Sequence, residues 1–302
     1  MLTFTVIGLF QGVLYGLLAV GLVLVYKGTR VFNFAQGEFG SVAAFATFGL
    51  LTLVSDTPQT PSGVDMAVAV SGGLVAALLV GLLMERLIVR PLFDASRITL
   101  LVATVGVTLL LASLIFIVAK PETRVLAPLI EGGVSGRGIF GAPVQNQQFL
   151  MAGVLVALAV LLALFFQRTN LGLAVLALSQ DPVATRIMGI GVPTISRFIW
   201  GFAALLGGVA GILQAGIPGY SFYPGFMTRE FLVPAFTGAV LGGMTSLPGA
   251  FVGGILVGLL QNLGIYFLGN KLQWPGPSDL TIFGVLLLVL LIRPRGLLGR
   301  EA

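Results

Sequence analysis

The sequence predicts an all-α fold, a polytopic transmembrane helix bundle with eight or nine membrane elements, some of them broken or re-entrant. Three observations predict it. Of the 302 residues, 57% are hydrophobic and only 9% are charged, whereas about a quarter of the residues of a soluble domain are charged. The mean hydropathy is +1.06. The 42 glycines suit transmembrane helices, which pack closely through small residues.

Apolar runs of about 20 residues mark the expected spans. The first run, 3–26, begins without a basic region or a cleavage site, so we expect a retained span and not a signal peptide. The others are 39–54, 66–88, 98–119, 149–167, 198–217, a double run over 231–268, and 279–293. The double run breaks at 245–249 and is either two spans or a re-entrant pair.

Basic residues orient the spans, because cytoplasmic loops are enriched in lysine and arginine. If the loop 27–38 is cytoplasmic, eleven of the sixteen basic residues fall on that side: Lys27, Arg30, Arg86, Arg90, Arg97, Arg168, Arg186, Arg197, Arg293, Arg295 and Arg300. The N-terminus is then outside and the C-terminus inside. We expect one transmembrane domain over 1–302, with the segment 168–197 as a cytoplasmic loop within it.

Several classes of chemistry lack the residues that they need. The chain has no cysteine and no histidine, which excludes thiolate sites and imidazole catalysis. None of Lys27, Lys120 and Lys271 stands in the G-x-x-x-x-G-K-[ST] pattern, so the chain cannot bind ATP by that loop. We expect neither an enzyme nor a metal site, and no cofactor bound by this chain.

Uncharged polar residues lie within several expected spans: Gln11, Gln214, Gln261 and Asn262. Such residues either join helices by hydrogen bonds in the lipid phase or line a polar pathway. Because Gln261 and Asn262 are adjacent in one helix, they cannot point in the same direction, so at least one should face another helix or a cavity.

The segment 33–40 contains polar residues, a glycine and then a short apolar run, which is typical of a broken helix. Glu38 is either an ordinary first-turn carboxylate, favourable at a helix N-terminus, or part of a half-helix beside a pathway. Asn33, Gln36 and Glu38 are therefore pathway candidates. Few ionisable residues lie at membrane depth, which argues against an ion-coupled carrier.

The segment 168–197 is too polar and too interrupted to span a bilayer. It predicts a helix over 171–180, followed by a short helix with Asp181 as N-cap and Pro182 as first residue, stopped at Gly189. It is either an ordinary cytoplasmic loop or a docking helix. We expect Val183, Ile187 and Ile190 to face the rest of the chain and Thr185, Arg186 and Met188 to face a partner.

Four stretches together resemble the permease subunits of branched-chain amino acid ABC transporters, and the likeness runs nearly end to end. They are 28–38 (G-T-R-V-F-N-F-A-Q-G-E), 179–190 (S-Q-D-P-V-A-T-R-I-M-G-I), the turn 242–250 (G-G-M-T-S-L-P-G-A) and 293–297 (R-P-R-G-L). The length is similar to the smaller of the two permease types. The resemblance implies that Asp181, Thr185, Arg186, Met188 and Gly189 couple to an ATPase, although the Glu-Ala-Ala pattern of other importers is missing.

The resemblance also implies partners and a location. A related second permease, two cytoplasmic ATPases that bind the ATP, an extracytoplasmic binding protein and the bilayer of the bacterial inner membrane would surround the chain, with no nucleic acid. Members of this family also carry urea, amides and other small solutes. Branched-chain amino acids are the most common substrate in the family, and we expect them here. A stand-alone channel or secondary carrier for a neutral solute stays open, because the broken elements near 33–40 and 245–249 suit it as well.

Overall fold

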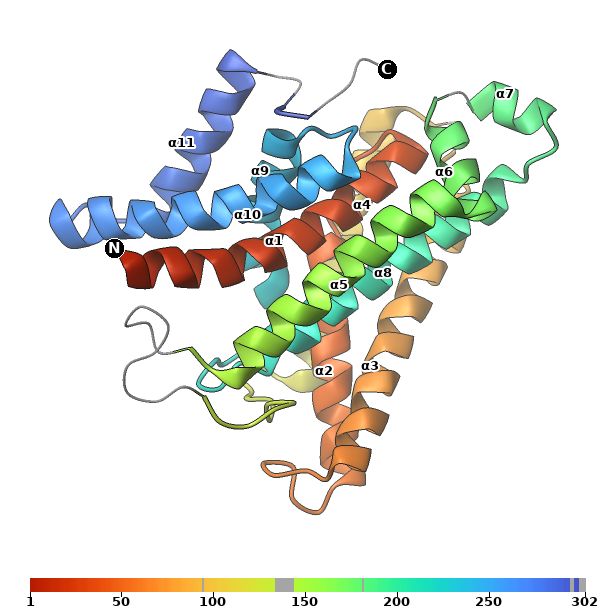
Figure 1. Ribbon diagram of the computed structural model, residues 1–302. Coiled ribbons are helices and arrows are strands. Elements are labelled where there is room, and N and C mark those ends of the chain that lie inside the picture. The colour runs from red at the N-terminus through yellow and green to blue at the C-terminus, as the bar shows by residue number, and fades with distance from the viewer. Residues whose placement is uncertain (94, 134–143, 181, 294–295, 299–302) are drawn as a thin grey trace. The chain divides into compact units, whose positions relative to one another are not determined.

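The computed structural model describes residues 1–93, 95–133, 144–180, 182–293 and 296–298. Within them, helices account for nearly all regular structure (Figure 1). The helices are α1 (Leu2–Thr29), α2 (Gln36–Val54), α3 (Gly63–Met84), α4 (Arg97–Ala119), α5 (Asn146–Arg168), α6 (Asn170–Gln180), α7 (Pro182–Ile187), α8 (Val192–Ala215), α9 (Val233–Gly242), α10 (Leu247–Gly264) and α11 (Pro277–Ile292). The polytopic helical fold class is confirmed.

Local sequence signals explain where these helices begin. Ser62, Ser96 and Ser246 each precede a helix, and each hydroxyl accepts a hydrogen bond from the backbone N–H three residues later. Such caps satisfy backbone donors that a helix start leaves without a partner. A proline stands in the first turn of α8, α10 and α11, where its missing N–H costs nothing.

Seven helices of the described chain are long and apolar enough to cross a membrane, and α11, with 16 residues, is a shorter apolar helix. Three π-helical turns extend the regular elements: Glu85–Val89 after α3, Met227–Leu232 before α9 and Ile265–Lys271 after α10. Six of the seven spans match single predicted apolar runs, and the seventh, Leu247–Lys271, overlaps the second half of the double run. The total of eight or nine elements and the orientation of the termini stay predictions.

The double apolar run forms a hairpin with arms of unequal length. α9 has 10 residues and α10 has 18, with the turn between them at 243–246. Ten residues rise only about 15 Å, half of the hydrocarbon core. The arms pack through small residues, since Gly238 lies against Gly254 and Gly242 against Gly249. α9 by itself is therefore too short for a span.

The contacts divide the chain into two compact units, each considered by itself. The first contains Met1–Val23, Ile130–Leu161 and Phe231–Ala302. In this unit the N-terminal half of α1 lies antiparallel to α10, with Gly8 against Gly258 and Gly12 against Ile255. The tail after α11 returns to the end of α9, where the Leu297 N–H donates to the Leu241 carbonyl.

The second unit contains Leu24–Leu129 and Leu162–Glu230. Its centre is a three-helix layer of α2, α3 and α8, and Figure 1 shows α2 and α3 side by side. α2 runs parallel to α8, because Gln36 contacts Ala203 and Gly40 contacts Gly211. A Cβ atom on Gly40 would lie 2.8 Å from the Gly207 carbonyl oxygen, so the helix backbones nearly touch. The prediction of a single domain over 1–302 stays a prediction.

Candidate functional site

The segment 168–197 folds as its sequence predicts. α6 covers the first predicted helix and α7 the second. Gly189 ends α7 with a φ of +78°, in the left-handed region that glycine adopts at low cost. The Ile190 N–H donates to the Thr185 carbonyl and the Met188 N–H to the Ala184 carbonyl, which closes the end of the helix. Asp181 lies outside the described residues.

The predicted faces of α7 are wrong at Ile187 and Thr185, whereas Met188 is exposed, as its predicted outward face requires. Ile187, expected to pack inward, is 81% exposed, and Thr185, expected to face a partner, is only 1% exposed. Helix α7 packs against α6 and α8, and the small Thr185 side chain fits at that contact. Ile190 does not continue the expected apolar face, because the left-handed backbone at Gly189 breaks the helical phase.

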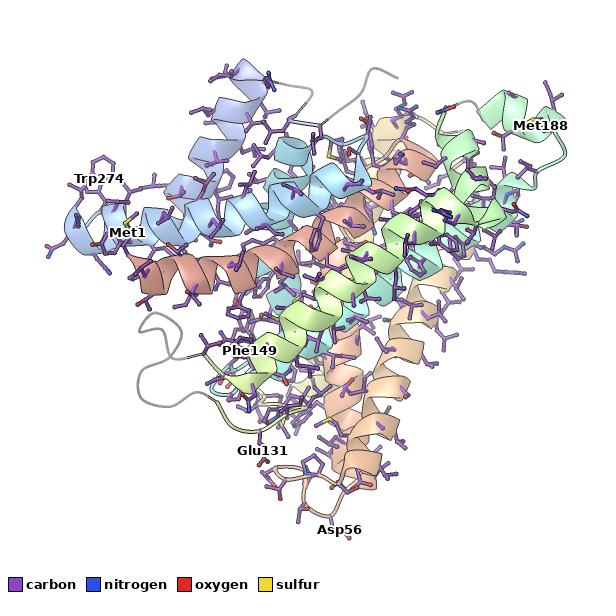
Figure 2. The ribbon with its side chains drawn as sticks, in the orientation of Figure 1. Met1, Asp56, Glu131, Phe149, Met188 and Trp274 are labelled. Carbon is purple, nitrogen blue, oxygen red and sulfur yellow. The ribbon has the colours of Figure 1, made fainter. Side chains whose placement is uncertain are left out.

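The described side chains at the end of α7 are therefore exposed and apolar. Met188 is exposed beside Ile187, and Figure 2 shows it at the outer edge of this segment. Gly189 is exposed as well. Nothing is described of the Arg186 side chain, so its predicted role stays a prediction. Two large apolar side chains on a polar loop form a small surface of the kind that partner proteins cover.

A cavity of about 440 Å³ lies between the segment 189–193 and the end of the π-helical turn after α3. Arg90 and Phe93 line one side, and Gly189, Ile190, Gly191, Val192 and Pro193 line the other. Gly191 is the residue before α8, and Pro193 stands in the first turn of that helix. Only the four residues 188–191 thus separate α7 from α8, the most buried helix of this unit.

Three pathway candidates lie at the start of α2, and all three are fully buried: Asn33 in the turn before the helix, and Gln36 and Glu38 in its first turn. The side-chain carbonyl oxygen of Asn33 accepts a hydrogen bond from the Ala35 N–H at 3.0 Å, which forms an Asx-type turn. Its amide donates to Gln36 Oε1 at 3.3 Å, and Gln36 Nε2 donates to the Ala203 carbonyl of α8 at 2.9 Å. Asn33 and Gln36 therefore tie this irregular backbone to α8.

Glu38 lies in the first turn of α2, as one of its two interpretations requires. Its carboxylate is fully buried, and neither oxygen has a hydrogen-bond partner among the described residues. The Ser41 and Thr228 hydroxyls and the positive charge of Arg229 interact with this carboxylate, but neither hydroxyl makes a well-oriented hydrogen bond within the described chain. A buried carboxylate without a well-formed hydrogen bond is costly, which is typical of a functional position.

Three other candidates make hydrogen bonds between helices. Asn262 Nδ2 donates to Gln11 Oε1 at 2.7 Å, joining α10 to α1. Gln261 Nε2 donates to Ser278 Oγ at 2.7 Å, joining α10 to α11. The adjacent amides point to different helices, as expected. These hydrogen bonds are the ones that the helix-joining interpretation requires, and the pathway role of the three residues stays a prediction. Gln214 is buried in the last turn of α8, in the other unit.

Sequence reasoning missed two sets of residues. Thr228, beside Glu38, is too distant in the chain for any spacing rule to connect them. Tyr220 and Tyr223 both donate to the Glu230 carboxylate, at 2.9 and 2.8 Å. Burial, and then the hydrogen bond to Glu230, raise the pKa of Tyr223 to about 12. The two tyrosines three residues apart, at 220 and 223, were the available signal.

Among the described residues, no group of three or more acidic side chains gathers to hold a metal ion. The short helix α7 has an exposed apolar end and leads into the buried helix α8. The buried polar turn before α2 is hydrogen-bonded to α8. Such an arrangement can convert a push on the segment into movement of a membrane helix.

Known proteins resemble the chain along most of its length. The family described as "Branched-chain amino acid transport system / permease component" matches residues 4–292. The "High-affinity branched-chain amino acid transport system permease protein BraD" of Pseudomonas aeruginosa is 31% identical over 300 residues, which cover 97% of this chain and 94% of that protein. The corresponding LivH protein of Escherichia coli K12 is 28% identical over 296 residues, covering 97% and 94%.

More distant likenesses agree with these. The "Probable branched-chain amino acid transport permease protein LivH" of Methanocaldococcus jannaschii is 27% identical over 303 residues, covering 94% of this chain and 88% of that protein. Among solved structures, "PsaBC from Streptococcus pneumoniae in complex with Fab" aligns with a TM-score of 0.51 at 15% identity, covering 97% of this chain and 92% of that chain. At that identity the likeness concerns the fold alone.

The relatives are transport permeases, and the apolar helices make this chain a multi-pass membrane protein. The motifs at 28–38, 179–190, 242–250 and 293–297 had predicted the same family. Because the family covers all but the ends of the chain and BraD is 31% identical over nearly its whole length, the chain belongs to the permease component family of branched-chain amino acid transport systems.

Proposed function

We propose that the chain is the permease subunit of an ATP-binding-cassette importer of the bacterial inner membrane, and that it carries branched-chain amino acids. The single observation that carries the mechanism is the exposed apolar end of α7, which leads within a few residues into the buried helix α8. The printed names of BraD and LivH support the substrate class.

The partners follow from this assignment. A second related permease completes the pathway, two cytoplasmic ATPases bind the ATP, and an extracytoplasmic binding protein delivers the substrate. The chain itself holds no ATP and performs no covalent chemistry in this proposal, since its three lysines all lie outside a P-loop pattern. The segment 168–197 is the coupling loop, and Ile187 and Met188 form its contact with an ATPase.

The mechanism needs a rigid connection from the coupling loop to the membrane. ATP closes the two ATPases, and α7 moves with them. α8 follows, because the loop between α7 and α8, residues 188–191, is short. α2 and α3 follow α8, because their backbones are in direct contact with it at Gly40 and Gly81. Close-packed interiors shift as units and do not deform gradually.

The substrate pathway is proposed to run beside the buried turn before α2. Irregular backbone at membrane depth must be buried in protein or line a cavity, and Asn33 and Gln36 hold this turn on α8. Glu38 and Thr228 would then offer polar atoms to a passing amino acid, whose ammonium group suits a carboxylate.

The test is transport by the assembled importer and by the chain alone. The chain is reconstituted in liposomes with and without its ATPases, and uptake of radiolabelled leucine is measured with and without ATP inside. We expect uptake only with the ATPases, ATP and binding protein present. Uptake by the chain alone would instead support a stand-alone channel or carrier. Competition by isoleucine but not by urea or acetamide would support the amino-acid substrate over the other solutes.

A further inference from the structure

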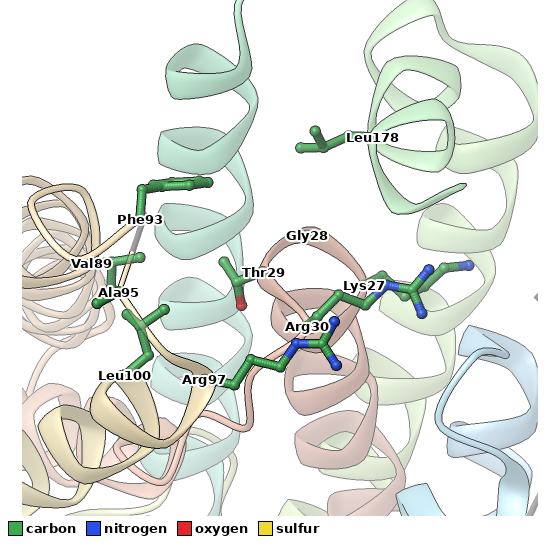
Figure 3. A pocket seen from close by; sticks show the side chains of 10 residues that line it. All are labelled: Lys27, Gly28, Thr29, Arg30, Val89, Phe93, Ala95, Arg97, Leu100 and Leu178. Atoms are coloured by element: carbon green, nitrogen blue, oxygen red, sulfur yellow. The ribbon is translucent and has the colours of Figure 1, made fainter. Parts of the chain in front are cut away.

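The cavity of about 440 Å³ beside the loop between α7 and α8 has an arginine, Arg90, and an aromatic ring, Phe93, on one wall. Both residues follow the π-helical turn Glu85–Val89, and the segment 189–193 forms the opposite wall. Figure 3 shows Phe93 on the opposite side of the neighbouring cavity from Arg97. Among the described lining residues, Arg90 is therefore the one cation of the larger cavity.

Arg90 lies on this wall without a partner in the part of the chain that the structure describes. Its side chain is half-buried, and its guanidinium group makes no hydrogen bond or ion pair with any described residue. Asp94 and Asp181 lie outside those residues. A cation that is partly removed from water without a counter-charge costs free energy. An anion that enters the cavity would remove that cost through charge-assisted hydrogen bonds.

The described surface around the cavity is also basic. Arg197 lies at the edge of the cavity, because its Nε donates to the Pro193 carbonyl at 3.4 Å and Pro193 lines the cavity. Within the described residues of 85–97 and 168–197, the acidic side chain is Glu85, which is fully buried, and the exposed charged side chains are Arg86, Arg97, Arg168 and Arg197. The positive-inside rule accounts for such an excess, but the excess still predicts that a surface covering this one is acidic.

The position of the cavity indicates which kind of molecule covers it. Met188 directly precedes Gly189, the first residue of the cavity wall, and both Met188 and Ile187 are exposed. A protein that covers these two apolar side chains therefore also covers the cavity. The residues 189–191 belong to no candidate membrane span of the described chain, which favours a protein over a lipid. Apolar contacts that exclude water around a charge pair are typical of the centre of a protein interface.

We propose that the ATPase places the carboxylate of an aspartate or glutamate in this cavity, where the Arg90 guanidinium binds it and Arg197 adds charge at the edge. This inference rests on the proposed function, and it names the chemistry of the ATPase surface that covers the coupling loop. Arg90 follows α3, whereas the segment 189–193 leads into α8. A carboxylate in the cavity would therefore connect the ATPase to α3 directly, and not only through α8.

The first test is zero-length cross-linking in the assembled complex. Arg90→Lys places a primary amine at the proposed contact, and its matched control, Arg86→Lys, places the same amine at an exposed position of the same π-helical turn. A carbodiimide joins an amine to a carboxylate only where the two touch, and mass spectrometry identifies the joined peptides. We expect position 90 to cross-link to an aspartate or glutamate of the ATPase, about tenfold more than position 86.

The second test measures affinity. The full chain in detergent is titrated with its purified ATPase, for the natural chain and for Arg90→Gln, Arg90→Lys and Arg86→Gln. We expect Arg90→Gln to weaken binding about tenfold or more, because it leaves the carboxylate of the partner buried without a charge beside it. Arg86→Gln should change the affinity less than about twofold. Arg90→Lys keeps the charge, so its nearly natural affinity would show that the loss in Arg90→Gln is not a folding defect.

The outcomes separate this inference from the proposed function. If the natural chain binds its ATPase but Arg90→Gln binds equally well, or if positions 86 and 90 cross-link equally, the inference is overturned and the proposed function stands. Binding to phosphatidylglycerol vesicles that Arg90→Gln abolishes, with the ATPase affinity unchanged, would assign the cavity to a lipid headgroup and also overturn the inference. A natural chain that binds no ATPase would overturn both.

Discussion

Helices α4 and α8 have nearly the same length and both are apolar, yet their surroundings differ completely. In α8, 78% of the most apolar window is buried within the chain, and in α4 only 17%. The difference lies in the side chains. α8 is rich in glycine and alanine and carries Ser196 and Gln214, whereas α4 is mostly leucine, valine and isoleucine. In a membrane, small residues mark the packed helix and large apolar residues mark the lipid-facing helix.

The largest expected effect comes from placing the same side chain in each helix. Gly211→Leu would force atoms into the Gly40 backbone of α2, and overpacking of this kind costs about 3 kcal/mol or more. We expect the variant to lose its monodisperse peak in thermal size-exclusion assays. The control is Gly106→Leu in α4, where nothing lies within 4 Å of the added Cβ atom. Equal melting temperatures for the two variants would contradict the difference in packing between α8 and α4.

For Glu38, at the buried start of α2, we predict that a substitution impairs transport without impairing folding. Glu38→Gln keeps the shape and removes a carboxylate that has no hydrogen-bond partner in the described chain, so stability should change by less than about 1 kcal/mol. Leucine uptake by the assembled importer should fall about tenfold or more. The control is Glu122→Gln, which removes an exposed ion pair and should leave uptake intact. Normal uptake by Glu38→Gln would remove this residue from the pathway.

Much of this fold could be predicted from the sequence, because bilayer thickness sets the length of a span. The segment 168–197 was predicted down to the stop at Gly189, since capping signals are local. The buried and exposed helices could not be separated by hydropathy, which is high for both α4 and α8. The contact of Glu38 with Thr228 and the inward turn of Thr185 depend on packing between distant segments, which no local pattern reports.

Hydrogen bonds between helices should matter less than the close packing of α8. Asn262→Leu leaves Gln11 without its 2.7 Å partner, and such bonds in membrane proteins contribute about 0.6 kcal/mol on average, up to about 1.7. The double variant with Gln11→Leu should recover part of the loss. A melting temperature that falls further in the double variant than in Asn262→Leu would show that the pair is not coupled in this way.

The smallest expected effect lies outside the spans. Tyr223→Phe removes a hydrogen bond to Glu230, worth about 0.5–1 kcal/mol. Because the folded chain raises the pKa of Tyr223 from its ordinary value of 10.0 to about 12, this contribution is complete below pH 10 and is lost as the pH rises through about 12. When tyrosinate formation is followed by ultraviolet absorbance, the variant should lack the step near pH 12 that Tyr223 gives. An unchanged titration curve would contradict the assignment.

The central claim, that the exposed end of α7 docks an ATPase and moves α8, can be tested by labelling, because the natural chain has no cysteine. Single variants Ile187→Cys, Thr185→Cys and Val64→Cys are reacted with a maleimide, in the chain alone and in the complex with its ATPases. Ile187 and Val64 are exposed, and Thr185 is buried. We predict that complex formation slows labelling at position 187 about tenfold or more, as interface burial excludes reagent. Position 64 should label equally in both states and position 185 slowly in both. Labelling at position 187 that is equally fast in the chain and in the complex would contradict the account.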